Sequence, residues 1–303
     1  MRFLYLLEKI RMPGLNELFL AVTRLGEETA FLVIGLIVFW CVGKRKGYYV
    51  MTVGLAGTVI SQLMKIVCRI PRPWVRDKNF TILEQARDSA GGYSFPSGHT
   101  QSAAGTFGAI SMFAAKTWIR AICWVLIILV GLSRMYIGVH TPADVLVGAG
   151  LSIMLIYFFY PLMLGKKDRT YLGLGILAFL SIIYLIYMEL TVFPPDIDID
   201  NLESARKNAY TIFGCSAALL IVYPVERRFI QFQESAAWWV QILKVILGLL
   251  IVLAVKEGLR APLDWLFGGH LLARSVRYFL IVIVAGLLWP LTFPFITRLG
   301  EKK

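Results

Sequence analysis

Three short stretches of the chain hold residue types that together can bind and break a phosphate ester. They are residues 65–73, 96–99 and 133–144. The chain has only three histidines, and two of them, His99 and His140, fall within these stretches. The stretches also supply three fixed cations and the carboxylate of Asp144. Phosphoryl transfer needs cations around the phosphoryl oxygens, a nucleophile and a general acid, so these residues predict that chemistry.

The first stretch places Lys65 and Arg72 near the end of an apolar run. Pro71 and Pro73 predict that the helix ends there, because proline cannot continue a helix and restricts the residue before it. The Arg72 guanidinium can present two N–H donors to phosphate oxygens, and Lys65 offers a compact point charge. Taken alone, the stretch is more typical of cations that extend from a helix end to the membrane surface.

The second stretch, Pro96-Ser97-Gly98-His99, opens another apolar run. A helix starting there would direct unpaired backbone N–H groups and the positive end of its dipole at an anion. Ser97 is a favoured N-cap residue that can also bond a phosphate oxygen, and Gly98 lets the backbone approach a ligand. His99 in the first turn is unusual for a structural residue, because the dipole disfavours its charged form. An ordinary serine cap beside a surface histidine is the alternative.

The third stretch carries Arg134, His140 and Asp144. Thr141 and Pro142 predict the N-cap and first position of a helix, which puts Asp144 at the third helical position. A capping box is therefore the structural alternative for this carboxylate. His140 lies just before the helix, within reach of Asp144, and such a pair fixes the imidazole tautomer and stabilises the imidazolium. Arg134 supplies a third phosphate contact.

In this order and spacing the stretches resemble the type 2 phosphatidic acid phosphatase superfamily, membrane lipid phosphatases related in fold to vanadium haloperoxidases. Its signatures Lys-x6-Arg-Pro, Pro-Ser-Gly-His and Ser-Arg-x5-His-x3-Asp all occur without a departure, and the resemblance covers roughly residues 10–165. It implies a phosphohistidine on His140, activated by Asp144, with His99 as the acid and then the base. It also implies a cradle for the phosphoryl oxygens made of Lys65, Arg72, Ser97, Gly98 and Arg134. No metal or other cofactor is implied.

Long apolar runs dominate the chain, which is 58% hydrophobic with a mean hydropathy of +0.69. Runs of about 20 residues are typical of membrane spans. The sequence predicts an all-α polytopic membrane bundle of about nine transmembrane helices, at residues 29–42, 49–68, 98–115, 119–132, 145–164, 172–188, 209–223, 238–255 and 276–295. Apolar residues at helical spacing before Gly26 predict an amphipathic helix lying in the membrane interface.

The net charge of +12 is concentrated in short connectors, at residues 44–46, 116–120, 166–169, 227–228 and 298–303. In the nine-span topology these fall on one side, which the positive-inside rule assigns to the cytoplasm. The three phosphate-binding stretches lie on the other side, with the acidic segment 196–203. We therefore expect a multi-pass protein of a bacterial cytoplasmic membrane with its site on the outer face, and no nucleic-acid partner.

A charged connector near residues 165–170 divides the chain into a catalytic bundle, 1–165, and an appended four-helix transmembrane region, 166–303. The appended region matches none of the three signatures. We expect Lys244, inside a span, to extend to the interface, and His270 to be a surface or interfacial residue. The four cysteines lie in or beside apolar runs, and their spacing fits neither a disulfide framework nor a zinc site.

The sequence thus predicts metal-independent hydrolysis of a lipid phosphate or diphosphate, such as polyprenyl diphosphate or phosphatidate. The expected partners are that substrate and membrane lipids, and no oligomeric state is indicated. A phosphotransferase that passes the same phosphoryl group to an acceptor lipid stays open, because the catalytic residues do not separate the two. A lipid transporter or scaffold is supported only by the four extra spans, and the intact His–Asp pair argues against it.

Overall fold

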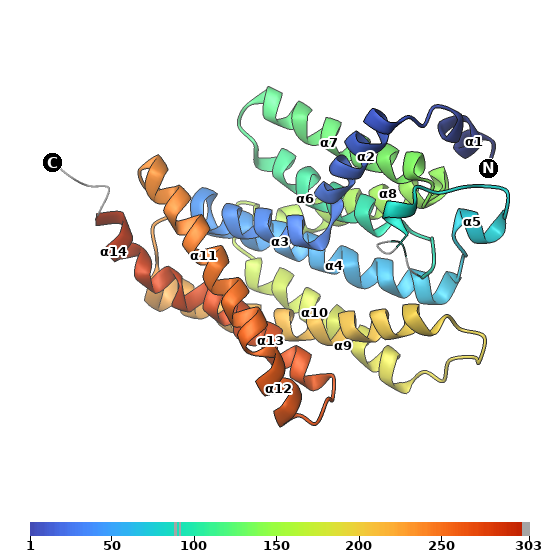
Figure 1. Cartoon of the computed structure of the whole chain (residues 1–303). Helices are drawn as coiled ribbons and strands as arrows, with labels where there is room; N and C mark the ends of the chain where they lie inside the picture. The colour runs from blue at the N-terminus through green and yellow to red at the C-terminus, as the bar shows by residue number, and fades with distance from the viewer. Residues whose placement is uncertain (88–89, 91, 299–303) are drawn as a thin grey trace. The chain divides into compact units, whose positions relative to one another are not determined.

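The computed structural model describes residues 1–87, 90 and 92–298, and this part of the chain is helical with no strand (Figure 1). It divides into two compact units. The first unit comprises Met1–Leu32, Val53–Tyr160 and Val192–Ala205. The second unit comprises Val33–Thr52, Pro161–Thr191 and Arg206–Lys303. The predicted functional division into 1–165 and 166–303 stays a prediction, and the compact units do not follow it as a single cut in the chain.

The first unit is built around α6, the short helix that follows the second phosphate-binding stretch. Small residues along α6 let α7 pack closely beside it, and α1 and α2 pack on α7. The helices and turns of this unit are α1 (Arg2–Lys9), α2 (Pro13–Thr23), η1 (Arg24–Gly26), most of α4 (Lys44–Cys68), α5 (Pro73–Arg76), η3 (Glu84–Ala86), α6 (Gly98–Phe113), α7 (Thr117–Ile137), most of α8 (Pro142–Met163) and the start of α10 (Ile199–Val225).

The second unit contains the helices that follow the catalytic stretches, together with the chain just before α4. In it α11 packs against α12, α13 and α14, and α12 packs against α13. Its elements are the second half of α3 (Glu28–Ile37), η2 (Val38–Val42), the start of α4, α9 (Thr170–Leu190), most of α10, η5 (Glu226–Ile230), α11 (Trp238–Gly258), α12 (Arg260–Leu266), α13 (Leu272–Ile283), η6 (Val284–Leu288), η7 (Pro290–Thr292) and α14 (Phe293–Arg298).

The number of membrane spans is smaller than predicted. In the described part of the chain seven helical segments are long and apolar enough to cross a membrane, or eight if the bent pair Pro13–Gly26 and Glu28–Val42 forms one span. The predicted span 98–115 is not among them, since α6 has only 16 residues and reaches about 24 Å, short of a hydrocarbon core of about 30 Å. The predicted span 29–42 reaches sufficient length only with α2. The count of nine is therefore not confirmed.

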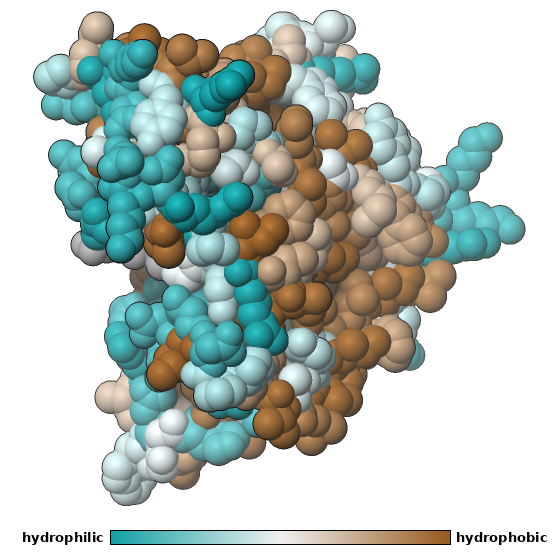
Figure 2. All heavy atoms as spheres, turned by 90° about the vertical axis from the view of Figure 1, so that its right-hand side faces the viewer, coloured by the Kyte–Doolittle hydropathy of each residue, from teal (hydrophilic) through white to brown (hydrophobic). Residues whose placement is uncertain are grey.

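The surface agrees with a membrane environment. Figure 2 shows apolar side chains gathered over a broad area of one face, with hydrophilic side chains beside it. On α7 and α8, large apolar side chains such as Val125, Ile128, Leu146 and Met154 are more than half exposed. A soluble protein rarely leaves so much apolar surface open, so these helices face lipid.

The N-terminal segment is part of the first unit. The Leu4 side chain on α1 is fully buried in a cluster with Phe80, Ile82, Met135 and Val145. Beyond α1, the Arg11 guanidinium donates to the carbonyl oxygens of Tyr136 and Thr81, both at 3.0 Å. The segment expected to lie only in the membrane interface thus also covers the end of α7, where the catalytic stretch begins.

Lys244 differs from its predicted environment. Its side chain is fully buried within the second unit, where Nζ lies 3.3 Å from the carbonyl oxygen of Gln233 and 4.6 Å from the centroid of the Phe293 ring. The expected extension to the interface is therefore wrong. The chain before α11 folds over the lysine and supplies the carbonyl oxygens that water would otherwise supply.

Candidate active site

The end of α7 and the start of α8 fix the positions of His140 and Asp144. Gly138 ends α7 with φ of +95°, and a Cβ there would lie 2.8 Å from Arg11 Nη2, so glycine is required. The α8 helix then begins with reciprocal caps. The Thr141 N–H donates to Asp144 Oδ2 at 2.7 Å, and the Asp144 N–H donates to Thr141 Oγ1 at 3.3 Å. Asp144 does form the predicted capping box, and the same oxygen also faces His140.

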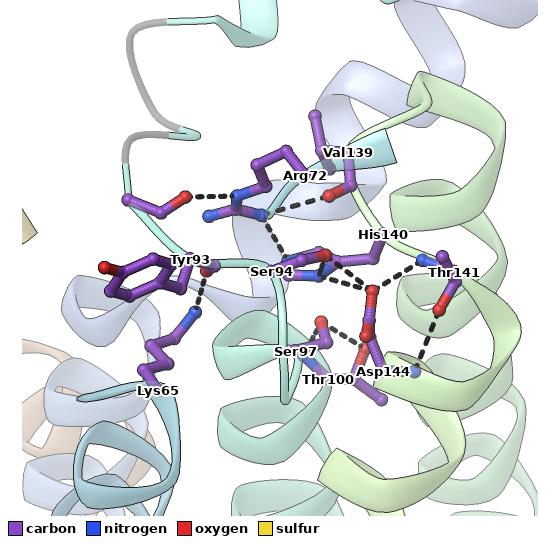
Figure 3. Close-up of polar contacts among 11 residues, drawn as sticks. Lys65, Arg72, Tyr93, Ser94, Ser97, Thr100, Val139, His140, Thr141 and Asp144 are labelled. Atoms are coloured by element: carbon purple, nitrogen blue, oxygen red, sulfur yellow. Dashed lines mark hydrogen bonds and ion pairs between the residues drawn. The ribbon is translucent and has the colours of Figure 1, made fainter. Parts of the chain in front are cut away.

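His140, Asp144 and Ser94 form a buried cluster (Figure 3). The Ser94 hydroxyl donates to Asp144 Oδ2 at 2.6 Å. His140 Nδ1 lies 3.4 Å from Ser94 Oγ and 3.5 Å from Asp144 Oδ2. Ser94 therefore joins the imidazole to the carboxylate, a role that the sequence did not predict because Ser94 lies outside the three signatures.

The contact between Arg72 and His140 determines the tautomer of the imidazole. Arg72 Nη1 lies 2.8 Å from His140 Nε2. A guanidinium has only N–H donors, so Nε2 must accept this hydrogen bond and carries a lone pair. The proton of the neutral ring is then on Nδ1, facing Ser94 and Asp144 (Figure 3). The Nε2 lone pair is therefore directed at a buried cation.

The three predicted phosphate-binding cations are all buried in the first unit, with exposed fractions of 7% for Lys65, 5% for Arg72 and 1% for Arg134. The Lys65 ammonium donates to the Tyr93 carbonyl at 2.8 Å. Arg72 donates to the carbonyl oxygens of Gly92 and Val139, both at 3.1 Å. These neutral acceptors hold the side chains of Lys65 and Arg72 in place.

Arg134 is held by a residue far from it in the sequence. Its Nη1 donates to Thr23 Oγ1 at 2.7 Å, while its Nε is buried without a hydrogen-bond partner among the described residues. Among the described residues, Lys65 and Arg134 form no ion pair with a carboxylate. A buried guanidinium with an unused donor is costly unless an anion completes it.

The second stretch forms the start of α6 as predicted. Ser97 is the N-cap, with the Thr100 N–H 3.4 Å from its Oγ, and its own N–H donates to the Asp144 carbonyl at 3.0 Å. A Cβ on Gly98 would meet no atom within 4 Å, so space lies in front of the helix at this point. Ser97 is fully buried, and its hydroxyl is used by the cap.

Two glycines let other segments approach the start of α6. A Cβ on Gly26 would lie 2.6 Å from the His99 carbonyl oxygen, and a Cβ on Gly148 would lie 2.6 Å from the Ser97 carbonyl oxygen. Both distances are to backbone, which cannot move aside like a flexible side chain. Glycine at these positions therefore allows η1 and α8 to pack against the segment that carries Ser97 and His99.

The site favours an uncharged His140. Burial lowers the pKa of His140 well below its usual range, and the positive charges of Arg72, Arg134 and Lys65 lower it further. His99 is half-buried and interacts electrostatically with the same three cations, so both histidines share one cationic environment. In the described part of the chain no group of three or more His, Cys, Asp and Glu side chains is arranged to hold a metal ion.

The structure brings together the predicted residues Lys65, Arg72, His140 and Asp144, and it places Ser97, Gly98, His99 and Arg134 in the same unit. Sequence reasoning missed Ser94, which sits three residues before Ser97, and Thr23, which holds Arg134. Ser94 adjoins the second signature, so that proximity was a usable signal. Nothing in the sequence marks Thr23, because its partner lies 111 residues away.

Comparison with known families identifies the superfamily of the chain. The profile of the PAP2 superfamily matches residues 45–168, and the profile described as the transmembrane extension of PAP2 superfamily phosphatases matches residues 210–301. These two matches together cover most of the chain. The chain therefore belongs to the PAP2 superfamily. It is a multi-pass membrane protein and a lipid phosphate phosphatase.

Three relatives illustrate the range of the similarity. Phosphatidylglycerophosphatase B of Bacillus subtilis is 29% identical over 158 residues, which cover 49% of this chain and 75% of that protein. Undecaprenyl-diphosphatase BcrC of Bacillus subtilis is 33% identical over 133 residues, covering 41% and 64%. Sphingosine-1-phosphate phosphatase 1 of Mus musculus is 26% identical over 273 residues, covering 83% and 61%. The match thus spans less than two thirds of the latter two proteins. No solved structure matches the chain significantly.

Proposed function

We propose that the protein hydrolyses the terminal phosphate or diphosphate of a lipid through a phosphohistidine formed on His140. The observation that carries this proposal is the orientation of the imidazole. Its Nε2 lone pair faces the buried cation Arg72, and its Nδ1 proton faces Ser94 and Asp144. An anion drawn to the cations would therefore meet the nucleophilic nitrogen, and the carboxylate would stabilise the positive ring that results.

The reaction has two steps. His140 Nε2 attacks the terminal phosphorus, and the bond from that phosphorus to its bridging oxygen breaks. This oxygen is the lipid ester oxygen of a monophosphate or the anhydride oxygen of a diphosphate, and His99 donates a proton to it as it departs. In the second step His99 takes a proton from water, and the resulting oxygen nucleophile attacks the phosphohistidine to release inorganic phosphate. Asp144 and Ser94 hold the proton of His140 at Nδ1 throughout. The sum consumes one water and returns both histidines to their starting forms.

The phosphoryl oxygens are held by Lys65, Arg72 and Arg134, with Gly98 leaving room at the start of α6. Because phosphoryl transfer depends mainly on positioning and charge stabilisation, three buried cations can fill the role that divalent metals have in other phosphatases. We therefore propose metal-independent hydrolysis. Ser97 supports this cradle through the helix cap, and its hydroxyl would have to leave Thr100 to bind phosphate directly.

The substrate is proposed to be a lipid whose polar end carries one or two phosphates. The relatives are named for phosphatidylglycerophosphate, undecaprenyl diphosphate and sphingosine 1-phosphate, which share this feature and differ in their tails. The basic connectors on the opposite ends of the spans support a site on the non-cytoplasmic face.

The test is phosphate release by the detergent-purified chain from a panel of lipid phosphates and diphosphates, with EDTA present and His140→Ala as the control. We expect release that survives EDTA and falls at least about 10⁴-fold in the variant. Robust release by His140→Ala would rule out the covalent route. Activity that is lost in EDTA and restored by Mg²⁺ would rule out metal-independent hydrolysis.

A second measurement tests whether His99 is the general acid. His99→Ala should lose most activity on an alkyl phosphate and recover part of it on an aryl phosphate, whose departing oxygen needs less protonation. An equal loss on both substrates would show that His99 does not protonate the leaving group.

A further inference from the structure

A second cationic pocket lies wholly within the second unit, apart from the residues proposed for catalysis. It has a volume of about 500 Å³, a size typical of ligand sites. The pocket sits where one end of α10, the end of α12 and the start of α13 meet, which are three ends of membrane spans. Its cationic lining side chains are Lys207, Lys256, Arg260, Arg274 and Arg277.

The burial of the Arg277 guanidinium is the central observation. Its side chain is only 8% exposed, and its Nε is buried without a hydrogen-bond partner among the described residues. The nearby Tyr278 ring has its centroid 5.6 Å from the guanidinium carbon and holds the group by a cation–π contact. That contact does not satisfy N–H donors. A buried guanidinium with an unused donor, lining a cavity, has the chemistry of an anion site.

Neighbouring side chains are arranged to support the same ligand. Arg274 is fixed by donation from its Nε to Thr211 Oγ1 at 2.6 Å, and its guanidinium carbon lies 5.5 Å from the Tyr278 ring centroid. The Leu272 N–H donates to His270 Nδ1 at 3.1 Å, so the proton of the neutral His270 ring is on Nε2, where it can donate. His270 is exposed, as the sequence predicts, and it lines the pocket.

The carboxylates in the lining do not cancel the cations. Among the described lining residues, the carboxylates are Glu257 and Asp264, against the cationic side chains of Lys256, Arg260, Arg274 and Arg277. Glu257 pairs with Lys256 at 3.6 Å, on the exposed side of the pocket. The excess positive charge therefore remains on the buried side, around Arg274 and Arg277.

We propose that this pocket binds a phosphate group, carried either by an anionic membrane lipid or by free inorganic phosphate. Its position at the ends of three spans places it at the depth of lipid headgroups, where basic pockets between transmembrane helices bind such groups. The proposal does not depend on the catalytic mechanism, since the pocket shares no residue with the proposed active site.

The experiment measures radiolabelled inorganic phosphate bound by the full chain in phosphatidylcholine nanodiscs at constant ionic strength. We expect Arg277→Gln to weaken one class of site about tenfold or more, because it removes charge-assisted hydrogen bonds. Arg228→Gln removes the same charge from an exposed position outside the pocket and should leave binding unchanged. Equal binding by Arg277→Gln and the unmodified chain would overturn the proposal.

The experiment includes one further variant and one further lipid composition. Arg260→Gln changes an exposed lining residue whose loss leaves the buried packing intact, and it should weaken the same class of site if Arg277→Gln does not fold. In nanodiscs containing phosphatidylglycerol, a lipid-headgroup site should lose its bound inorganic phosphate by competition, whereas a site for free phosphate should retain it. Unchanged binding in both variants would leave no phosphate site here.

Discussion

The cations of the two units are held in different ways. In the second unit the Lys44 ammonium lies 2.8 Å from Glu226 Oε1, and Arg227 Nη1 lies 2.8 Å from Asp168 Oδ2. In the first unit the cations around His140 bind carbonyl oxygens and a hydroxyl. The first arrangement compensates charge with charge, whereas the second keeps positive charge available for an incoming anion.

The two kinds of contact indicate that lysine and arginine can have a structural role in one place and a functional role in another. A cation paired with a carboxylate has little electrostatic energy left for a ligand, while a cation held by dipoles retains most of it. Arg277 in the second unit follows the pattern of the first unit, which is why its pocket stands out from the paired cations around it.

Asp144→Asn should reduce kcat by about 10²–10⁴-fold, because an amide cannot stabilise the charged imidazole that forms on His140. Initial rates on the best lipid substrate measure the effect. Since Asp144 also caps α8, thermal unfolding must accompany the assay. Turnover close to that of the unmodified chain would leave Asp144 with only its capping role.

Arg134→Gln should reduce kcat/KM by about 10²–10³-fold, the range expected when one donor to developing negative charge is removed. The comparison variant in the second unit is Arg227→Gln, which removes an exposed guanidinium from its contact with Asp168 and should alter turnover less than about twofold. Similar losses in both variants would remove the distinction between the two kinds of cation. Steady-state kinetics on the same substrate compares them directly.

Ser94→Ala should reduce turnover about tenfold, because the carboxylate loses one hydrogen bond and the imidazole loses a positioning contact. Nitrogen NMR of the imidazole should show a smaller population of the tautomer protonated at Nδ1. Ser94→Thr restores the hydroxyl and should recover part of both. An unchanged tautomer ratio in Ser94→Ala would contradict the positioning role.

The pH dependence follows from the lowered pKa of His140. The neutral nucleophile stays populated until the pH falls below the folded-state pKa, so kcat/KM should lose less than about twofold from His140 protonation between pH 7 and 6. The unfolded chain binds this proton near pH 6.5, so His140 should lower the stability of the folded state as pH falls below that value. Titration of the imidazole by NMR with a midpoint near 6.5 would contradict this.

Glu226→Gln should have the smallest effect on turnover and a clear effect on stability. The change leaves Lys44 without its partner at 2.8 Å, which should lower the free energy of unfolding by about 1–3 kcal/mol. Turnover below the unfolding temperature should stay within about twofold. A loss of turnover at full folding would show that the paired cations also contribute to catalysis.

Much of the architecture was predictable from local patterns. The apolar runs indicated a helical membrane protein, and the proline, serine and threonine signals gave the end of α4 and the starts of α6 and α8. The number of membrane spans was not predictable from the sequence. The apolar run that contains α6 has the pattern of a span, whereas the helix itself has only 16 residues. Lys244 was misjudged because the segment that covers it, near Gln233, has no apolar pattern of its own.

The sequence by itself determined the chemistry available to the protein: two histidines, a carboxylate and three cations at fixed spacings, carried by apolar helices. These are short-range features, since each depends on residue type and on neighbours within a turn or two. Three contacts depend on the tertiary structure. Nε2 of His140 faces Arg72, Ser94 joins the imidazole to Asp144, and Thr23 holds Arg134. Those contacts join segments 46 to 111 residues apart, so they follow from helix packing, in which Gly26 and Gly148 let η1 and α8 approach the start of α6.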